Sequence, residues 1–390
     1  MIRSLFSGVS GMKNHQIRMD VIGNNISNVN TTGFKAGRTN FQDTLYQTIK
    51  SGGISTNPAQ TGLGINVASI SNYMEPGGLQ STGRTLDLGI NGNGFFKVNK
   101  GADDNYYTRD GIFYLTQDGR MVNSDGYQLV GTTWEKAKSF ATNLDPNNAI
   151  ATPGTLEVRG VLADGTVGQT VQIDFNAGES INDVLTKINA EQSTSGVMAY
   201  KRPNATNPDQ FDLYITTVYD GYDEIYTDVA NPALTVTDGS SLDLDGGNLE
   251  RNITNYTKNV PIQITNVPIS SINIQNNGMI TGQDNKGAPL LFEGDYDVAN
   301  ITLYMFPNQD GLERINQNLF RESVSSGTAE AGIPGETGYG TIESGFLEMS
   351  NVDLTDEFTN MIVTQRGYQA NSRIITVSDT MLEELMNLKR

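Results

Sequence analysis

Apolar or uncharged residues recur at alternating steps of three and four positions near the amino terminus. The stripe passes through Ile2, Leu5, Val9, Met12, Gln16, Met19, Gly23 and Ile26. This narrow period is typical of a coiled-coil seam and predicts a helix over residues 3–28. Because the stripe is thinner than the core-facing side of a globular helix, we expect the helix to need a partner.

The same spacing returns near the carboxyl terminus. It passes through Leu354, Phe358, Met361, Gln365, Tyr368, Ser372 and Ile375, then shifts to Val377, Met381, Leu385 and Leu388. The pattern predicts a second long helix, with Asn351 or Asp353 as its N-cap, since short polar side chains accept hydrogen bonds from the first free amides. The simplest partner for each terminal helix is the other one.

Residues between the two helices follow a different pattern. Short or alternating apolar runs are separated by the turn dipeptides Asn91-Gly92, Asp118-Gly119, Asp125-Gly126 and Asp310-Gly311. This pattern predicts antiparallel sheets.

One segment of the middle departs from the strand pattern. In "ESINDVLTKINAEQ", residues 179–192, the apolar positions Ile181, Val184, Leu185 and Ile188 fall on one helical face. We expect a short helix there, capped by Ser180 or Asn182.

Together these elements predict an α+β fold that is mainly β, with nested, discontinuous β domains and terminal helices that form a coiled-coil-like domain. Shifts in composition place the cuts near residues 70, 145, 290 and 345. The expected parts are a terminal helical domain (1–30 and 350–390), an extended linker (31–70), an inner β domain (71–145 and 286–349) and an outer inserted β-rich domain (146–285).

Composition excludes several classes of function. The 390 residues carry 26 Lys and Arg against 44 Asp and Glu, and the net charge of -18 repels nucleic acid and anionic membranes. The absence of Cys excludes disulfides, thiolate chemistry and sulfur-ligated metals. No run is long enough for a membrane span, and the first residues lack the apolar core of a signal peptide, so an exported chain needs another route.

Catalytic arrangements are poorly supported. His15 is the only histidine, which excludes imidazole triads and zinc sites with several histidines. The "GVSG" of residues 8–11 lacks the spacing of a nucleophile elbow. The "NGNGFF" of residues 91–96 falls short of a dinucleotide fingerprint and is more typical of a hairpin turn.

A calcium loop is also poorly matched. Asp243 and Asp245 are followed by glycines in "SLDLDGGNLE", but Gly247 stands where such a loop needs an oxygen ligand. We therefore expect no catalytic residue, no cofactor and no metal, and no enzyme activity.

The segment behind the first predicted helix carries a family resemblance. "GNNISNVNTTGFKAGR", residues 23–38, resembles the signature of bacterial flagellar axial proteins, the family of rod and hook subunits. Three further blocks match in family order: "LDLGINGNGFFKV" at 86–98, "YTRDGIFYLTQDGRMVNSDGYQLVG" at 107–131, and the carboxyl-terminal block of 350–390.

Other segments resemble the hook branch of that family. These are "NPAQTGLGINVASI" at 57–70, "FPNQDGLERINQNLFRESVSSG" at 306–327, and an insertion of the size found between about 145 and 285. Within the insertion, residues 178–200 are similar to a motif of flagellin-type insertions.

The resemblance implies a flagellar hook protein, a structural subunit that polymerises into a hollow curved tube and acts as a universal joint between rod and filament. Implied partners are further copies of the chain, rod and hook-filament junction proteins, the hook cap and the flagellar export apparatus. The implied location is extracellular, in the basal body and hook of a bacterial flagellum. Interfaces should be non-covalent, because the chain has no Cys for crosslinking.

The terminal stripes and the Asn-rich stretch supply the candidate contacts between subunits. Short amide side chains can hydrogen-bond to backbone where a helix unwinds, and Phe34 is the expected anchor behind them. The candidate interface residues are Leu5, Val9, Met12, Met19, Asn24, Asn25, Asn28, Asn30, Phe34, Phe358, Met361, Tyr368, Ile375, Leu382 and Leu385.

Other interpretations stay open at this point. The nearest is a distal rod subunit with an inserted outer domain. More remote are an extracellular β-rich adhesin, which would not explain both terminal blocks, and an Asp/Glu hydrolase, which would need paired carboxylates in a cleft.

Overall fold

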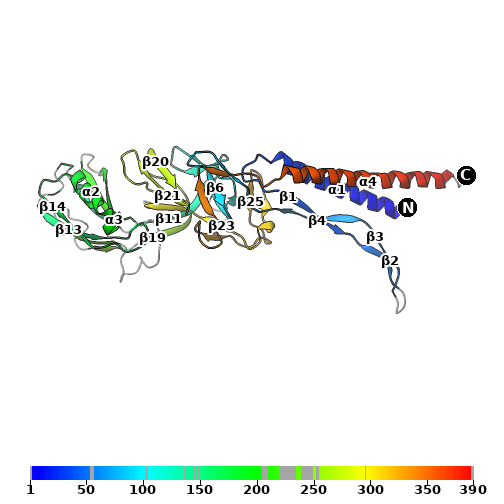
Figure 1. Ribbon diagram of the computed structural model, residues 1–390, viewed down its shortest axis with the longest axis horizontal. Helices are drawn as coiled ribbons and strands as arrows, with labels where there is room; N and C mark the ends of the chain where they lie inside the picture. Colours follow the sequence, from blue (N-terminus) through cyan, green and yellow to red (C-terminus); the bar gives the residue numbers. More distant parts are fainter. Residues whose placement is uncertain are drawn as a thin grey trace.

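The protein is elongated, with two helices at one end and a series of β-sheets extending away from them (Figure 1). The computed structural model describes residues 2–52, 57–101, 104–135, 138–144, 146–147, 150, 152–203, 210–218, 234–238, 249–251, 254–294 and 296–387. Both chain ends lie at the helical end of the molecule.

The predicted terminal helices are confirmed as α1 (Ile2–Ser27) and α4 (Leu354–Asn387). They run antiparallel, since the Ser4 hydroxyl lies 3.4 Å from that of Ser378, whereas Asn25 bonds to Glu357 at the opposite end of the pair. Asp353 is the N-cap of α4, because its Oδ1 accepts from the Thr355 amide at 2.7 Å.

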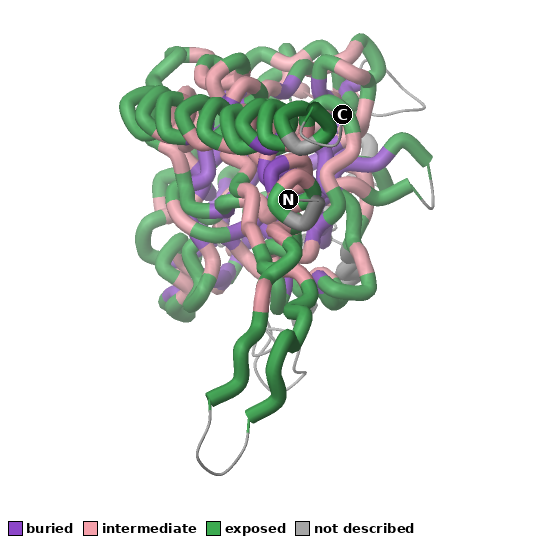
Figure 2. Tube along the Cα trace, turned by 90° about the vertical axis from the view of Figure 1, so that its right-hand side faces the viewer, coloured by how far each residue is buried: buried purple, intermediate pink, exposed green. Residues whose placement is uncertain are grey.

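A long ribbon follows α1. Strand β1 (Gly37–Asp43) pairs with β4 (Ile65–Asn72), and β2 (Tyr46–Lys50) pairs with β3 (Ala59–Gly62). The outer half of the ribbon projects away from the body as an exposed arm (Figure 2).

A large antiparallel sheet forms the middle of the molecule. Its main path runs β20-β21-β22-β11-β7-β8-β25-β24, and two small pairs, β5-β28 and β6-β27, lie outside it. The strands are β5 (Leu79–Ser81), β6 (Leu88–Asn91), β7 (Phe95–Asn99), β8 (Asn105–Thr108), β9 (Tyr114–Leu115), β10 (Met121–Val122), β11 (Gln128–Glu135), β19 (Thr254–Pro261), β20 (Ile269–Ile274), β21 (Met279–Asp284), β22 (Val298–Ile301), β23 (Leu303–Met305), β24 (Glu313–Arg314), β25 (Leu319–Arg321), β26 (Glu330–Gly332), β27 (Thr341–Ser344) and β28 (Phe346–Glu348).

An outer module lies at the end far from the helices (Figure 1). It contains a sheet of β12 (Lys138–Leu144), β16 (Phe211–Thr217) and β15 (Val197–Pro203), and a sheet of β14 (Val171–Phe175), β13 (Gly154–Arg159), β17 (Leu234–Asp238) and β18 (Leu249–Arg251). The predicted short helix is confirmed as α2 (Ile181–Ala190), followed by α3 (Gln192–Ser195). Ser180 caps α2 in a capping box with Asp183.

The turn dipeptides divide into two groups. Asp118-Gly119 joins the paired strands β9 and β10, and Asp125-Gly126 joins β10 to β11, as predicted for hairpins. The hairpin expected at Asn91-Gly92 is wrong, because β6 pairs with β27 rather than with β7. Asp310-Gly311 instead closes the 3-10 turn η2 (Gln309–Gly311).

The predicted α+β class, mainly β with terminal helices, is confirmed. The division into domains stays a prediction. Strands β19, β20 and β21, which that division assigns to the outer insertion, pair within the large sheet. One hydrophobic cluster fills the outer module and reaches Trp134, Met279 and Val298 at its base, and a second fills the large sheet.

Candidate assembly interface

Exposed apolar side chains gather at the helical end of the molecule. Among the large hydrophobic side chains that are exposed in the described residues, all but Tyr114, Val167, Val267 and Val324 lie within residues 1–73 or 354–387. Viewed from this end, α4 is mainly exposed (Figure 2). The exposed large hydrophobic side chains on α4 are those of Leu354, Phe358, Ile362, Val363, Tyr368, Ile374, Val377, Met381 and Met386.

The contact between α1 and α4 is made largely by small and polar residues, although Ile375 of α4 also packs against Gly8. A Cβ added to Gly11 would lie 2.6 Å from Nδ2 of Asn371, and one added to Gly367 would lie 2.9 Å from Nε2 of His15. Arg18 donates to Oδ1 of Asn360 at 3.2 Å. Residues on α1 that contact α4 in this way are Ser4, Gly8, Gly11, His15, Arg18 and Asn25.

This seam has the predicted three-and-four spacing, but it lies one position away from the apolar stripe. Since small side chains let two helices approach closely, the pair closes without burying that stripe. The predicted residues Leu5, Val9, Met12, Met19, Met361, Ile375 and Leu382 are only half-buried. Phe358 and Tyr368 are 50% and 37% exposed. The side chain of Leu385 lies outside the described residues.

The ribbon covers another side of α1. Nδ2 of the buried Asn14 donates to the Ile65 carbonyl oxygen at 2.7 Å, and the ring of His15 meets Phe41 edge-on at 5.9 Å. Burial, and secondly the charge of Arg18, lower the pKa of His15. His15 is therefore a packing residue between α4 and the ribbon.

Asn25 and Asn28 brace the backbone behind α1. Asn25 is buried, and its amide donates to the Gly37 carbonyl oxygen and accepts from the Gly37 N–H, both at 2.9 Å. Nδ2 of Asn28 donates to the carbonyl oxygen and side chain of Asn24 at 2.9 Å. Asn24 and Asn30 are exposed. Bonds to backbone within one chain are thus present, and bonds between subunits stay a prediction.

Phe34 anchors the chain where it enters the β body. It is 5% exposed, and the Arg314 guanidinium lies over its ring at 4.8 Å. Gly33 adopts a φ of 64°, and an added Cβ would lie 2.6 Å from the carbonyl carbon of Arg109. The turn before Phe34 therefore requires glycine.

Next to this anchor lies a buried ionic cluster that sequence reasoning missed. Nζ of Lys35 lies 2.6 Å from Oε1 of Glu348, and Nη1 of Arg109 lies 3.1 Å from Oε2; all three side chains are fully buried. Burial is the main cause that lowers the pKa of both Lys35 and Arg109. A signal existed, because the three residues stand in or beside three of the family blocks.

The described residues hold no group of three or more His, Asp or Glu side chains placed to bind a metal. Asp243 and Asp245 of the calcium-like segment lie outside them. None of the helices described is long and apolar enough to cross a bilayer.

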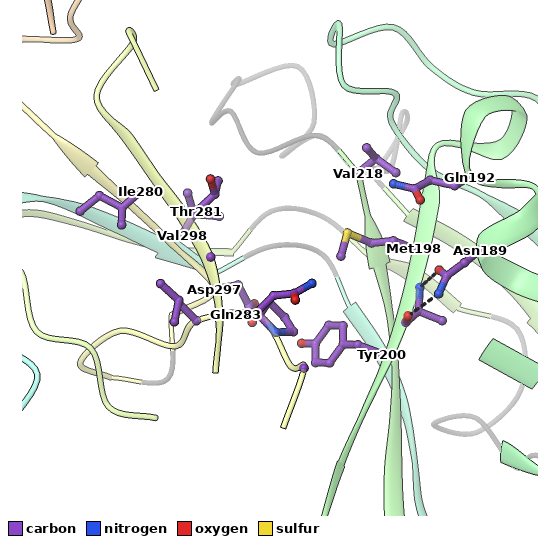
Figure 3. Close-up of a pocket in the computed structure, with 15 residues that line it drawn as sticks. Asn189, Gln192, Met198, Tyr200, Val218, Ile280, Thr281, Gln283, Asp297 and Val298 are labelled. Carbon is purple, nitrogen blue, oxygen red and sulfur yellow. Dashed lines mark hydrogen bonds between the residues drawn. The ribbon is translucent and has the colours of Figure 1, made fainter. Parts of the chain in front are cut away.

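A cavity of about 480 Å³ separates the outer module from the large sheet. Tyr200 from β15 points across it toward Gln283 and Asp297 (Figure 3), and hydrogen-bonds to Asp297. The side-chain amide of Asn189 donates to the Ala199 carbonyl oxygen and accepts from the Ala199 N–H. Both ends of this amide are therefore already hydrogen-bonded. The cavity therefore marks the junction of the two parts, with a polar contact across it.

Family models match several parts of the chain. The model of the flagella basal body rod protein matches residues 5–35, and that of the flagellar hook protein FlgE/F/G D1 domain matches 89–169. The flagellar basal body rod FlgEFG protein C-terminal model matches 343–388. The flagellin hook IN motif matches 155–208, which confirms the similarity expected for residues 178–200.

Curated relatives cover the whole chain. The flagellar basal-body rod protein FlgG of Bacillus subtilis (strain 168) and the flagellar hook protein FlgE of Borreliella burgdorferi are each 34% identical over 100% of both chains. The flagellar hook protein FlgE of Escherichia coli (strain K12) is 29% identical over 98% of both. The solved Helicobacter pylori flagellar hook protein FlgE2 is 14% identical, covers 69% of this chain and all of its own, and has a TM-score of 0.29.

Proposed function

Because this chain belongs to the family of flagellar hook and basal-body rod proteins, we propose that it is the structural subunit of a hook, which polymerises into a hollow curved tube between rod and filament. Hook and rod relatives both align along the full chain. The feature that supports the hook over the rod is the outer module that stands beyond the large sheet.

The observation that carries the proposal is the apolar surface left open on the terminal helices. Ile362 and Val363 are 59% and 58% exposed, so the α1-α4 seam leaves both side chains largely uncovered. Burying the open part of such a side chain contributes roughly 1 kcal/mol. Packing between many copies would therefore give the polymer its cohesion.

The β parts would serve a different purpose. A curved rotating tube must lengthen and shorten its longitudinal rows, so contacts between outer parts must slide. Polar, hydrated surfaces exchange partners at low cost, and the net charge of -18 keeps these surfaces hydrated. The helices would hold the tube together while the β surfaces allow it to bend.

The role is structural rather than enzymatic. As partners we propose further copies of the chain, rod and hook-filament junction proteins, the hook cap and the flagellar export apparatus. The protein would be exported to the flagellum without a cleavable leader. Amino-terminal sequencing of hooks purified from cells tests the last point, since a missing initial segment would contradict it.

A distal rod subunit is the second candidate. It is favoured by the Bacillus subtilis rod protein, which is as similar to this chain as the Borreliella burgdorferi hook protein. Deleting the gene separates the two: rods that lack hooks support the hook subunit, and loss of the rod itself supports the rival.

Electron microscopy of the purified full-length protein under polymerising conditions tests the structural role. Curved hollow tubes are expected. Straight shafts would favour the rod, and particles that stay monomeric at high concentration would contradict both proposals.

A further inference from the structure

The buried ionic cluster holds more positive than negative charge. Lys35 and Arg109 share the single carboxylate of Glu348, and no other carboxylate of a described residue forms an ion pair with either cation. A third cation is close, because Arg314 donates to the carbonyl oxygen of Lys35 at 2.5 Å. The cluster therefore carries an uncompensated positive charge.

Arg109 and Glu348 already form a balanced pair within the β body. Nη1 of Arg109 also donates to the Gly92 carbonyl oxygen at 3.0 Å, and Oε1 of Glu348 also accepts from the Gly77 N–H at 2.8 Å. Lys35 is the cation that the amino-terminal segment adds to this pair. Its own additional contact is with the backbone carbonyl oxygen of Glu75 at 2.8 Å.

Burying a cation that has no carboxylate of its own opposes folding of the segment that carries this cation. Removing an ion from water costs several kcal/mol, and attraction to a partner offsets this only with good compensation. Burial lowers the pKa of Lys35 by more than the Glu348 carboxylate raises it, and the charge of Arg109 lowers it further.

The free-energy cost of burying Lys35 arises only when the segment after α1 docks onto the β body. Lys35 lies on the segment that follows α1, whereas Arg109 and Glu348 lie on the β body. When the segment docks, the Gly33 N–H donates to the Glu348 carbonyl oxygen at 2.8 Å and the Ala36 N–H donates to Asn351 at 2.8 Å. Lys35 enters the interior in the same step.

We propose that Lys35 opposes docking of the amino-terminal segment, so that the segment detaches readily in a free subunit and stays docked when helix packing between copies supplies the missing free energy. The second half of this statement rests on the proposed function. The first half concerns the single chain alone.

Amide hydrogen exchange of Gly33 in the dilute full-length chain tests the inference. In Lys35→Met the surplus charge is gone and the Arg109–Glu348 pair remains, so exchange should be about tenfold slower or more. In Glu348→Gln the cations lose their carboxylate, so exchange should be faster. If Lys35 simply held the segment by attraction, both variants would exchange faster.

Lys13→Met is the matched control, because Lys13 is an exposed lysine of α1 and the change in net charge is the same. It should exchange like the unmodified chain. Fluorescence of Trp134, the sole tryptophan and buried in β11, reports whether the β body is folded.

Unchanged or faster exchange in Lys35→Met would overturn the proposal. So would loss of the native Trp134 signal in that variant, or equal slowing in Lys13→Met. Failure of the proposed function gives a different result: the exchange differences persist, but the chain does not polymerise at high concentration.

Discussion

Asn25 and Glu357 are hydrogen-bonded across the two ends of the chain: Nδ2 of Asn25 lies 3.0 Å from Oε1 of Glu357, 332 positions away. The same side-chain amide also donates to the Gly37 carbonyl oxygen and accepts from the Gly37 N–H. One buried side chain thus joins the end of α1, the start of α4 and the start of the ribbon.

Replacing Asn25 by Ala should loosen this junction. Three hydrogen bonds are lost and the half-buried Gly37 backbone loses its side-chain partner, which costs about 2 kcal/mol or more. Thermal unfolding of the terminal helices measures this loss of stability. Asn24→Ala is the control, because Asn24 is exposed and its side chain, among the described residues, bonds only to Asn28. Equal melting of the two variants would contradict the account.

Asn25→Ala combined with Asn28→Ala should also weaken polymerisation while the β body stays folded. Sedimentation of polymer measures the first effect, and Trp134 fluorescence measures the second. Unchanged assembly would count against a role for these amides in the polymer.

Replacing Gly33 by Ala should be strongly destabilising. Its left-handed backbone costs an L-residue about 1–2 kcal/mol, and the new Cβ meets the backbone of Arg109. Gly23→Ala is the matched control: Gly23 lies in α1 with open space around it, so Ala there should stabilise by about 0.5–1 kcal/mol. Chemical denaturation distinguishes the two, and effects of the same sign would be inconsistent with the observed turn.

Acidification should weaken the contact of α1 with α4 and the ribbon. Burial lowers the pKa of His15 below its ordinary value of 6.5, so the unfolded chain binds more protons at mildly acidic pH. The His15 contribution to stability is therefore present above pH 6.5 and falls as the pH drops through that value. His15→Gln should remove this part of the pH dependence between pH 7 and 5, measured by thermal unfolding. A superimposable profile for the two chains would contradict it.

Patterns of local origin were predictable from the sequence. The terminal helices, α2 with its Ser180 cap, and the hairpins at Asp118-Gly119 and Asp125-Gly126 depend on spacing and turn chemistry within a few residues. The Asn91-Gly92 turn was mispredicted because β27, far along the chain, supplies the pairing that decides it.

The contact between α1 and α4 was only partly predictable. Hydrophobic periodicity detects Leu5 and Phe358 but not a seam of Gly11, Asn371 and Gly367, since small and polar residues leave no apolar signal. The ionic cluster was hidden for another reason: Lys35 and Arg109 lie 313 and 239 positions from Glu348, and spacing along a chain does not reveal such meetings.

The critical concentration for polymerisation tests the central claim, that apolar faces of the terminal helices are left open in one chain and covered by its neighbours. Ile362→Ser with Val363→Ser should raise it about tenfold or more without changing the unfolding of the monomer. Val267→Ser with Val324→Ser, two exposed valines of the β body, should leave it unchanged. A critical concentration that is the same in all three chains would contradict the account.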